Sequence, residues 1–135
     1  MLLTTKSNKF EIIEEGLPVF MTSKTGNSDA FMNAYRMGEY TKTIDIGKHL
    51  PLTDTLNFYM GCSYLYSRDN VNAITHLSKI NKASEFYCNA LYQKAYACAN
   101  KKNNEQAITL LKEVLNKGCT NYVEKAEGFL KELTK

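Results

Sequence analysis

Six side chains of this sequence are of the types that carry metal, redox or nucleophilic chemistry. They are the four cysteines and the two histidines, Cys62, Cys88, Cys98, Cys119, His49 and His76. No two of the cysteines form a C-x-x-C pair, and neither histidine stands at a zinc-site spacing from them. Cysteine is among the residue types most often buried in a core. We therefore expect inert packing thiols, with a disulfide or a metal site as the lesser alternative.

Catalytic motifs of other kinds are also missing from the sequence. It has no glycine-rich nucleotide loop, no paired metal ligands and no nucleophile spaced with a base. His49 falls at the C-terminus of an expected helix, where positive charge is mildly favoured. His76 falls on a different expected helix from Cys62 and lies beside packing residues. These patterns favour a chain that is not an enzyme and that carries no cofactor.

The composition is that of an ordinary soluble domain. Of the 135 residues, 44% are hydrophobic and 23% are charged, and a compact fold of this size buries about two-thirds of the surface of its unfolded chain. The net charge of +3 arises from 17 basic and 14 acidic residues scattered along the chain. Scattered charge is weak evidence for nucleic-acid binding, so we expect no nucleic-acid partner. We also expect no membrane span in this chain, because no stretch reaches the length of about 20 apolar residues.

A second pattern concerns the elements that position these side chains. The string NAITHL at 72–77 returns as QAITLL at 106–111, thirty-four residues later. A fixed period of this size indicates a helical repeat. Apolar residues at three- and four-residue steps predict helices, with Ser84 and either Asn103 or Asn104 as caps. These helices cover 54–66, 71–80, 84–100 and 103–116, joined in antiparallel pairs by short connections.

Aligning the two helix pairs at this offset places small residues on small residues. The matched positions are Gly61 with Ala95, Ala73 with Ala107, and Leu77 with Leu111. Small side chains at those positions let two helices approach closely, while the leucine fills the space beside them. The repetition therefore predicts that one helix pair after another packs in the same way.

The same positions give the sequence its resemblance to the tetratricopeptide repeat family, whose unit is a thirty-four-residue helical hairpin. The motif residues are Met60-Gly61-x-x-Tyr64 with Ala73-x-x-x-Leu77, and Lys94-Ala95-x-x-Cys98 with Ala107-x-x-x-Leu111. The family's closing proline is absent, with Glu85 and Cys119 at those places. The resemblance implies an all-α fold, a short right-handed solenoid of antiparallel helical hairpins with a C-terminal capping helix.

Under this resemblance the chain divides into an N-terminal segment, 1–27, and a repeat domain, 28–135. The segment is a linker or a docking segment. The expected units of the domain are 28–52, 53–86 and 87–119, followed by a capping helix at 121–133. The string EEGLPVFM at 14–21 resembles the segment before the first repeat in membrane-anchored bacterial proteins of this kind. That likeness implies an anchor outside this chain, and it leaves open a cytoplasmic or an extracytoplasmic domain.

Function in the family lies on the concave surface formed by the first helix of each hairpin. The positions that the resemblance places there are Tyr35, Arg36, Tyr59, Tyr66, Gln93, Tyr96 and Asn100. Tyrosine offers a large contact area with a polar tip, and it is enriched at protein interfaces. We therefore expect a non-catalytic scaffold that binds a peptide segment or a partner domain. The alternative that some of these rings only pack between neighbouring hairpins stays open.

Two other functions would use features of the same sequence. A small-ligand or lipid-binding helical domain would close the tyrosine-lined groove with residues 10–21. A self-associating assembly subunit, and hence a homo-oligomer, would use the apolar side chains Phe10, Ile12, Ile13, Leu17, Val19 and Phe20. Both alternatives depend on the N-terminal segment, whereas the scaffold function depends on the repeats.

Overall fold

The computed structural model describes residues 26–135, and within that range every regular element is helical. The elements are α2 (Gly26–Arg36), α3 (Tyr40–Gly47), α4 (Asp54–Tyr66), α5 (Asn70–Leu77), α6 (Tyr87–Asn100), α7 (Asn104–Asn116), the 3-10 turn η1 (Thr120–Tyr122) and α8 (Val123–Leu133). The expected all-α class is thus confirmed for this part of the chain. Residues 10–21, which the two alternative functions invoke, lie outside the described residues.

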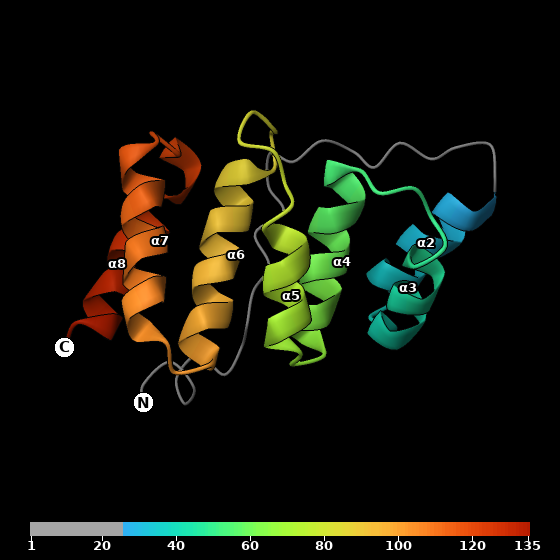
Figure 1. Cartoon of the computed structure of the whole chain (residues 1–135), viewed down its shortest axis with the longest axis horizontal. Coiled ribbons are helices and arrows are strands. Elements are labelled where there is room, and N and C mark those ends of the chain that lie inside the picture. The colour runs from blue at the N-terminus through green and yellow to red at the C-terminus, as the bar shows by residue number, and fades with distance from the viewer. Residues whose placement is uncertain (1–25) are drawn as a thin grey trace.

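The helices stand in chain order along the long axis of the molecule, with α2 and α3 at one end and α7 and α8 at the other (Figure 1). Each helix packs against the next one in the chain, from α2 on α3 to α7 on α8. The helix α4 also contacts α6, which is the second helix after it in the chain. The two helices of each pair therefore pack on one another, and neighbouring pairs also pack side by side.

The turn inside each helix pair has the same backbone conformation. Gly38, Arg68 and Lys102 all have a positive φ, of 77°, 67° and 68°. The next amide then donates to a carbonyl five residues earlier, in the bonds Glu39–Ala34, Asp69–Tyr64 and Asn103–Cys98. A left-handed residue followed by this bond is a common way to end a helix. Arg68 and Lys102 are thirty-four residues apart, so the period seen in the sequence also appears in the backbone.

The helix α4 has the predicted bounds and α7 begins one residue after its predicted start, whereas α5, α6 and α8 each differ from the prediction by two or three residues at one end. Asn103 caps α7 by accepting from the Gln106 amide at 3.2 Å, as predicted. Ser84 does not cap α6, because its hydroxyl accepts from Phe86 at 3.0 Å in the turn before the helix. The helix α5 ends at Leu77 and not at the predicted residue 80. The buried Ile80 extends the apolar pattern, although its amide bonds back to Leu77 in a tight turn.

Small residues set the distance between the helices of each pair. Gly61 on α4 faces Leu77 on α5, and a Cβ atom built on Gly61 lies 2.6 Å from Leu77 Cγ. Ala73 beside them is fully buried. In the following pair Ala107 and Leu111 are fully buried in the same way. The predicted close approach is therefore present in both pairs.

The buried apolar side chains form two clusters along the row. One cluster joins α2 to α5 with the start of α6, and includes Phe31, Leu56 and Phe58. The other joins α6, α7, η1 and α8. Ile74, Tyr87 and Tyr96 are partly buried and pack against both clusters. The helices α6 to α8 thus bury a core of their own, beside the core of the preceding pairs.

A histidine contact ties the two helices of the α4–α5 pair. His76 Nδ1 lies 2.9 Å from Oδ1 of the buried Asn57, and the His76 ring stacks on Tyr64 with centroids 5.5 Å apart. Burial, and to a lesser degree the charge of Lys79, lowers the pKa of His76 below its usual value. The neutral ring is therefore the form that the folded chain favours.

Two glycine substitutions test the close packing of α4 against α5. Gly61→Ala forces a methyl group against Leu77 and should lower the free energy of unfolding by about 1–3 kcal/mol. Gly128→Ala is the matched control, because nothing lies within 4 Å of a Cβ atom on this glycine of α8. The control should raise stability by up to about 1 kcal/mol through helix propensity. Denaturant unfolding measures both, and stabilisation by Gly61→Ala contradicts the packing.

The His76 contact predicts a loss of stability in mild acid. Its pKa in the folded chain lies below the unfolded value of 6.5, so the unfolded chain binds more protons between the two values. This contribution to stability is complete above about pH 6.5 and is lost as the pH falls through the folded-state pKa. Urea unfolding from about pH 7.5 to 5.5 measures the loss. His76→Gln should reduce it, whereas the control His49→Gln, in the turn after α3, should retain it; an undiminished loss in His76→Gln contradicts the assignment.

Candidate functional site

Two of the predicted surface tyrosines are buried between neighbouring helix pairs. Tyr35 on α2 and Tyr59 on α4 are each 6% exposed. Their ring centroids lie 5.0 Å apart in an edge contact, and Tyr59 also meets Phe86 at 6.2 Å. Neither ring lies on an open surface, so for Tyr35 and Tyr59 the alternative that a ring packs between neighbouring helix pairs holds. Edge contacts between aromatic rings of adjacent pairs hold these residues inside the molecule.

Gln93 is buried as well, although the sequence predicts it on the accessible surface. It is fully inaccessible, and its Nε2 donates to Asn89 Oδ1 at 2.9 Å along α6. Its Oε1 finds no hydrogen-bond partner among the described residues. A buried carbonyl without a donor lowers the stability of the folded chain. Gln93 is therefore a buried polar residue of α6 and is not available to a partner on the surface.

The other four predicted residues keep some exposure. Tyr66, Tyr96 and Asn100 are half-buried, and Arg36 is exposed at the end of α2. Tyr66 stacks on Tyr40 of α3, with centroids 4.4 Å apart and an interplanar angle of 10°. The ring of Tyr66 thus spans two helix pairs while part of it stays accessible.

Contacts of the turn between α4 and α5 with the end of α6 bring Tyr96 and Asn100 close to Arg68 and Asn70. Asn100 Nδ2 donates to Asn70 Oδ1 at 3.3 Å. The charge of Arg68, in the turn after α4, acts on the Tyr96 hydroxyl. We name the tyrosine strip by its residues, Tyr40, Tyr66, Arg68, Tyr96 and Asn100. Its residues come from three helix pairs: Tyr40 begins α3, Tyr66 and Arg68 lie at and just after the end of α4, and Tyr96 and Asn100 lie near the end of α6. Arg68 is its exposed cation.

The electrostatics of the strip favour hydrogen bonding over acid–base chemistry. Burial raises the pKa of Tyr96, and the nearby Arg68 guanidinium opposes that shift only in part. The phenol therefore stays protonated at neutral pH and can donate a hydrogen bond. Arg68 and Tyr40 were not among the residues predicted from the sequence. That prediction took only the first helix of each hairpin, whereas Arg68 lies in a turn and Tyr40 begins a second helix.

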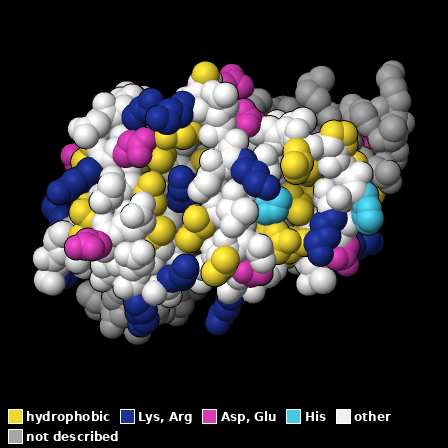
Figure 2. Space-filling view, viewed as in Figure 1, with side chains coloured by type: hydrophobic (Ala, Val, Ile, Leu, Met, Phe, Trp, Pro, Cys, Tyr) yellow, Lys and Arg dark blue, Asp and Glu magenta, His cyan; other side chains and the backbone are white. Residues whose placement is uncertain are grey.

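Charges on the face that Figure 2 shows do not gather by sign. On that face, Lys and Arg side chains alternate with Asp and Glu side chains and with apolar patches. Within residues 26–135, no group of three or more His, Cys, Asp or Glu residues could hold a metal ion. Over the same residues, no helix is long and apolar enough to cross a membrane.

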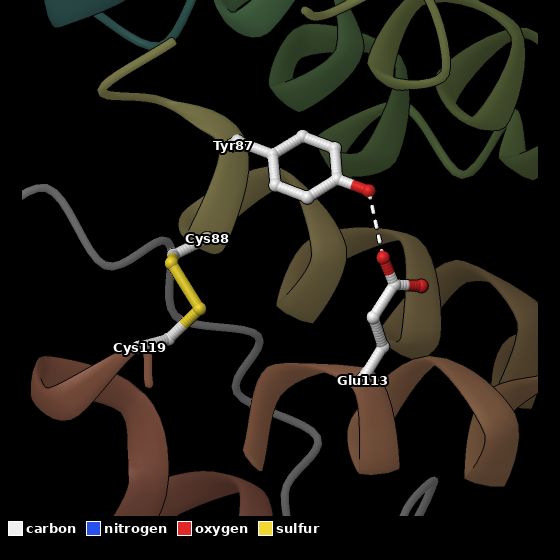
Figure 3. Close-up of a disulfide and its surroundings, with 4 residues drawn as sticks. All are labelled: Tyr87, Cys88, Glu113 and Cys119. Carbon is white, nitrogen blue, oxygen red and sulfur yellow. Dashed lines mark hydrogen bonds between the residues drawn. A yellow bond between two sulfur atoms is a disulfide. The ribbon is translucent and has the colours of Figure 1, made fainter. Parts of the chain in front are cut away.

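A disulfide joins Cys88 to Cys119 (Figure 3). The expectation of four packing thiols is therefore wrong for this pair, whereas Cys62 and Cys98 are buried thiols as predicted. Cys88 lies in the first turn of α6 and Cys119 lies just after α7, with Cα atoms 5.6 Å apart. In an antiparallel helix pair the start of the first helix lies beside the end of the second helix. The pairing of these cysteines could have been expected from that geometry, but not from a cysteine-spacing motif.

Polar contacts reinforce the same end of the α6–α7 pair. The Tyr87 hydroxyl donates to Glu113 Oε2 at 2.8 Å (Figure 3), and Lys117 Nζ lies 5.3 Å from the centre of the Tyr87 ring. Burial and the hydrogen bond to Glu113 raise the pKa of Tyr87 to about 12. Covalent, hydrogen-bond and cation–π contacts thus join the start of α6 to the end of α7.

Thiol counting tests the pairing of the cysteines. The chain purified without reductant and then denatured should react with an alkylating reagent at Cys62 and Cys98 only. Its intact mass should be smaller by two hydrogen atoms than that of the reduced chain. Peptide mapping should recover a linked pair that contains Cys88 and Cys119. Four reactive thiols, or a link through Cys62 or Cys98, contradicts the structure.

Comparison with known proteins gave no relative on which to base a function. No protein-family model matches the sequence, and neither the curated proteins nor the solved structures gave a match.

Proposed function

We propose that residues 28–135 form a short right-handed solenoid of tetratricopeptide-like hairpins in which α8 is the capping helix. The repeated turn at Arg68 and Lys102 supports this proposal, as does the packing of each helix on the next. The capping role rests on the sidedness of α8, which buries Ala126 and Phe129 and exposes Glu124, Lys125 and Glu127. Terminal units of repeat proteins need such a polar outer face.

We further propose that the domain is a non-catalytic scaffold that binds a segment of another protein on the tyrosine strip. The observation that carries this proposal is that the exposed Arg68, two residues after the half-buried Tyr66, acts on the hydroxyl of the half-buried Tyr96 in the next helix pair. Large rings with polar tips are common anchors at interfaces. The buried Tyr35, Tyr59 and Gln93 then support the strip from within rather than touch the partner.

The chemistry of the strip narrows the kind of segment that fits. Arg68 is exposed and can pair with a carboxylate, while the half-buried Asn100 can hydrogen-bond to a peptide group. An apolar or aromatic side chain of the segment would pack on the Tyr40–Tyr66 stack. The preferred partner is therefore a peptide segment with an acidic residue next to an apolar one, and Arg36 at the end of α2 can extend the contact.

The disulfide bears on the compartment of the domain. Disulfides form and persist in oxidising environments and are rare in the reducing cytosol. The Cys88–Cys119 bond therefore supports the extracytoplasmic alternative, in which the domain belongs to a membrane-anchored bacterial protein.

The small-ligand, lipid-binding and self-associating alternatives draw on residues 10–21, and no feature of residues 26–135 favours them over the scaffold.

A double substitution tests the strip as the binding surface. Tyr66→Ala with Tyr96→Ala should weaken binding of a partner peptide by about 2 kcal/mol, or roughly 30-fold in Kd, because two interface anchors are lost. Tyr64→Ala is the matched control, since this half-buried ring of α4 stacks on His76 of α5 instead. A pulldown from the native organism identifies the peptide, and calorimetry gives the affinities.

The controls separate binding from folding. Thermal unfolding of each variant reports whether the helices remain intact. If Tyr64→Ala weakens binding as much as the double substitution does, the strip is not the binding surface.

A further inference from the structure

The disulfide closes a loop that coincides with one structural unit. Its two cysteines bracket α6 and α7 almost completely, at a sequence separation of 31. The helices inside the loop share a buried cluster with α8 that includes Leu91, Leu111 and Phe129. The loop, its core and its capping helix therefore form a terminal unit, which we define as residues 87–133.

Contacts between the terminal unit and the rest of the row are of a different kind. They are non-covalent: α6 packs on both α4 and α5, Ala90 and Ala97 of α6 belong to the buried cluster of the preceding helices, and Asn100 donates a hydrogen bond to Asn70. No disulfide joins the described helices α2–α5 to the terminal unit. In linear arrays each unit contacts only its neighbours, so an end unit can open while the others stay folded.

A disulfide stabilises chiefly the unit whose loop it closes, because it restricts the unfolded state of that loop. Cys88 and Cys119 lie outside α2–α5, so opening of those helices from the other end of the row does not require the disulfide loop to unfold. Reduction should therefore act on the terminal unit first. The Tyr87–Glu113 bond at the same end remains after reduction, but it is a single polar contact.

We propose that the Cys88–Cys119 disulfide makes the terminal unit a redox-sensitive element, which opens on reduction while α2–α5 remain folded. An external dithiol is the reductant. It transfers two electrons and two protons, the sulfur–sulfur bond becomes the two thiols of Cys88 and Cys119, and the dithiol is oxidised to its own disulfide. Cys88 is the more exposed cysteine of the pair, so attack on its sulfur is the more accessible route.

Opening of this unit also displaces two of the five residues of the tyrosine strip. Tyr96 and Asn100 belong to α6, and Phe129 of α8 packs on Tyr92 and Tyr96 with ring centroids 5.9 and 6.1 Å apart. Loss of these contacts allows Tyr96 to move away from Arg68 of the preceding pair. The redox state would thus control the surface, although the opening itself does not depend on whether the strip binds a partner.

Hydrogen exchange on the full chain tests the proposal without any partner. Amide exchange is followed by mass spectrometry with and without dithiothreitol, in α7 and α8 of the terminal unit and in α4 outside it. Reduction should accelerate exchange in α7 and α8 at least about tenfold more than in α4. Equal acceleration in all three helices means global destabilisation and overturns the proposal, as does unchanged exchange in α7 and α8.

A double variant controls for direct effects of the reagent. Cys88→Ser with Cys119→Ser cannot form the bond, so its exchange pattern should match that of the reduced wild type and should not respond to dithiothreitol. If this variant does not fold, the wild type that is reduced after folding still decides the outcome. A response of the folded variant to dithiothreitol equal to that of the wild type overturns the role of this disulfide.

Discussion

Close approach of the two helices within each pair is the constraint on which the rest of the structure depends. Gly61 admits Leu77 where any larger residue would collide with it, and the buried Ala107 and Leu111 repeat the arrangement one period later. Interiors are packed closely enough that even a single methyl group matters. The left-handed turns at Gly38, Arg68 and Lys102 then end the first helix of each pair, and the tyrosine strip forms beside these turns.

The strip and the disulfide lie at opposite ends of α6. Tyr96 and Asn100 stand in its last two turns, next to Arg68 and Asn70 of the preceding pair. Cys88 and Tyr87 stand in its first turn, linked to Cys119 and Glu113 at the end of α7. The helix α6 thus connects a covalently fixed end with an end that carries exposed polar and aromatic groups. This arrangement is the physical basis for coupling redox state to the proposed binding surface.

The sequence predicted those features that a local pattern encodes. Apolar periodicity and the 34-residue offset predicted α4 within its observed bounds, and the small residues Gly61 and Ala107 predicted close packing. Features that depend on the approach of distant segments were not predictable in this way. Tyr59 is buried by rings of other helix pairs, and Cys88 meets Cys119 only because the α6–α7 pair folds back on itself. The predicted end of α5 was too late because Ile80 continues the apolar pattern of a helix, although it lies in the turn after α5.

Chemical-shift mapping with the captured partner peptide tests most directly the claim that the tyrosine strip is the surface on which this domain binds its partner. Amide and side-chain resonances are assigned for the oxidised chain, and the peptide is added in steps. The shift changes should be largest in two stretches thirty-four residues apart, around Tyr66 to Asn70 and around Asn100 at the end of α6. Shift changes concentrated on the exposed sides of α3 and α5, with these stretches unaffected, would contradict the account.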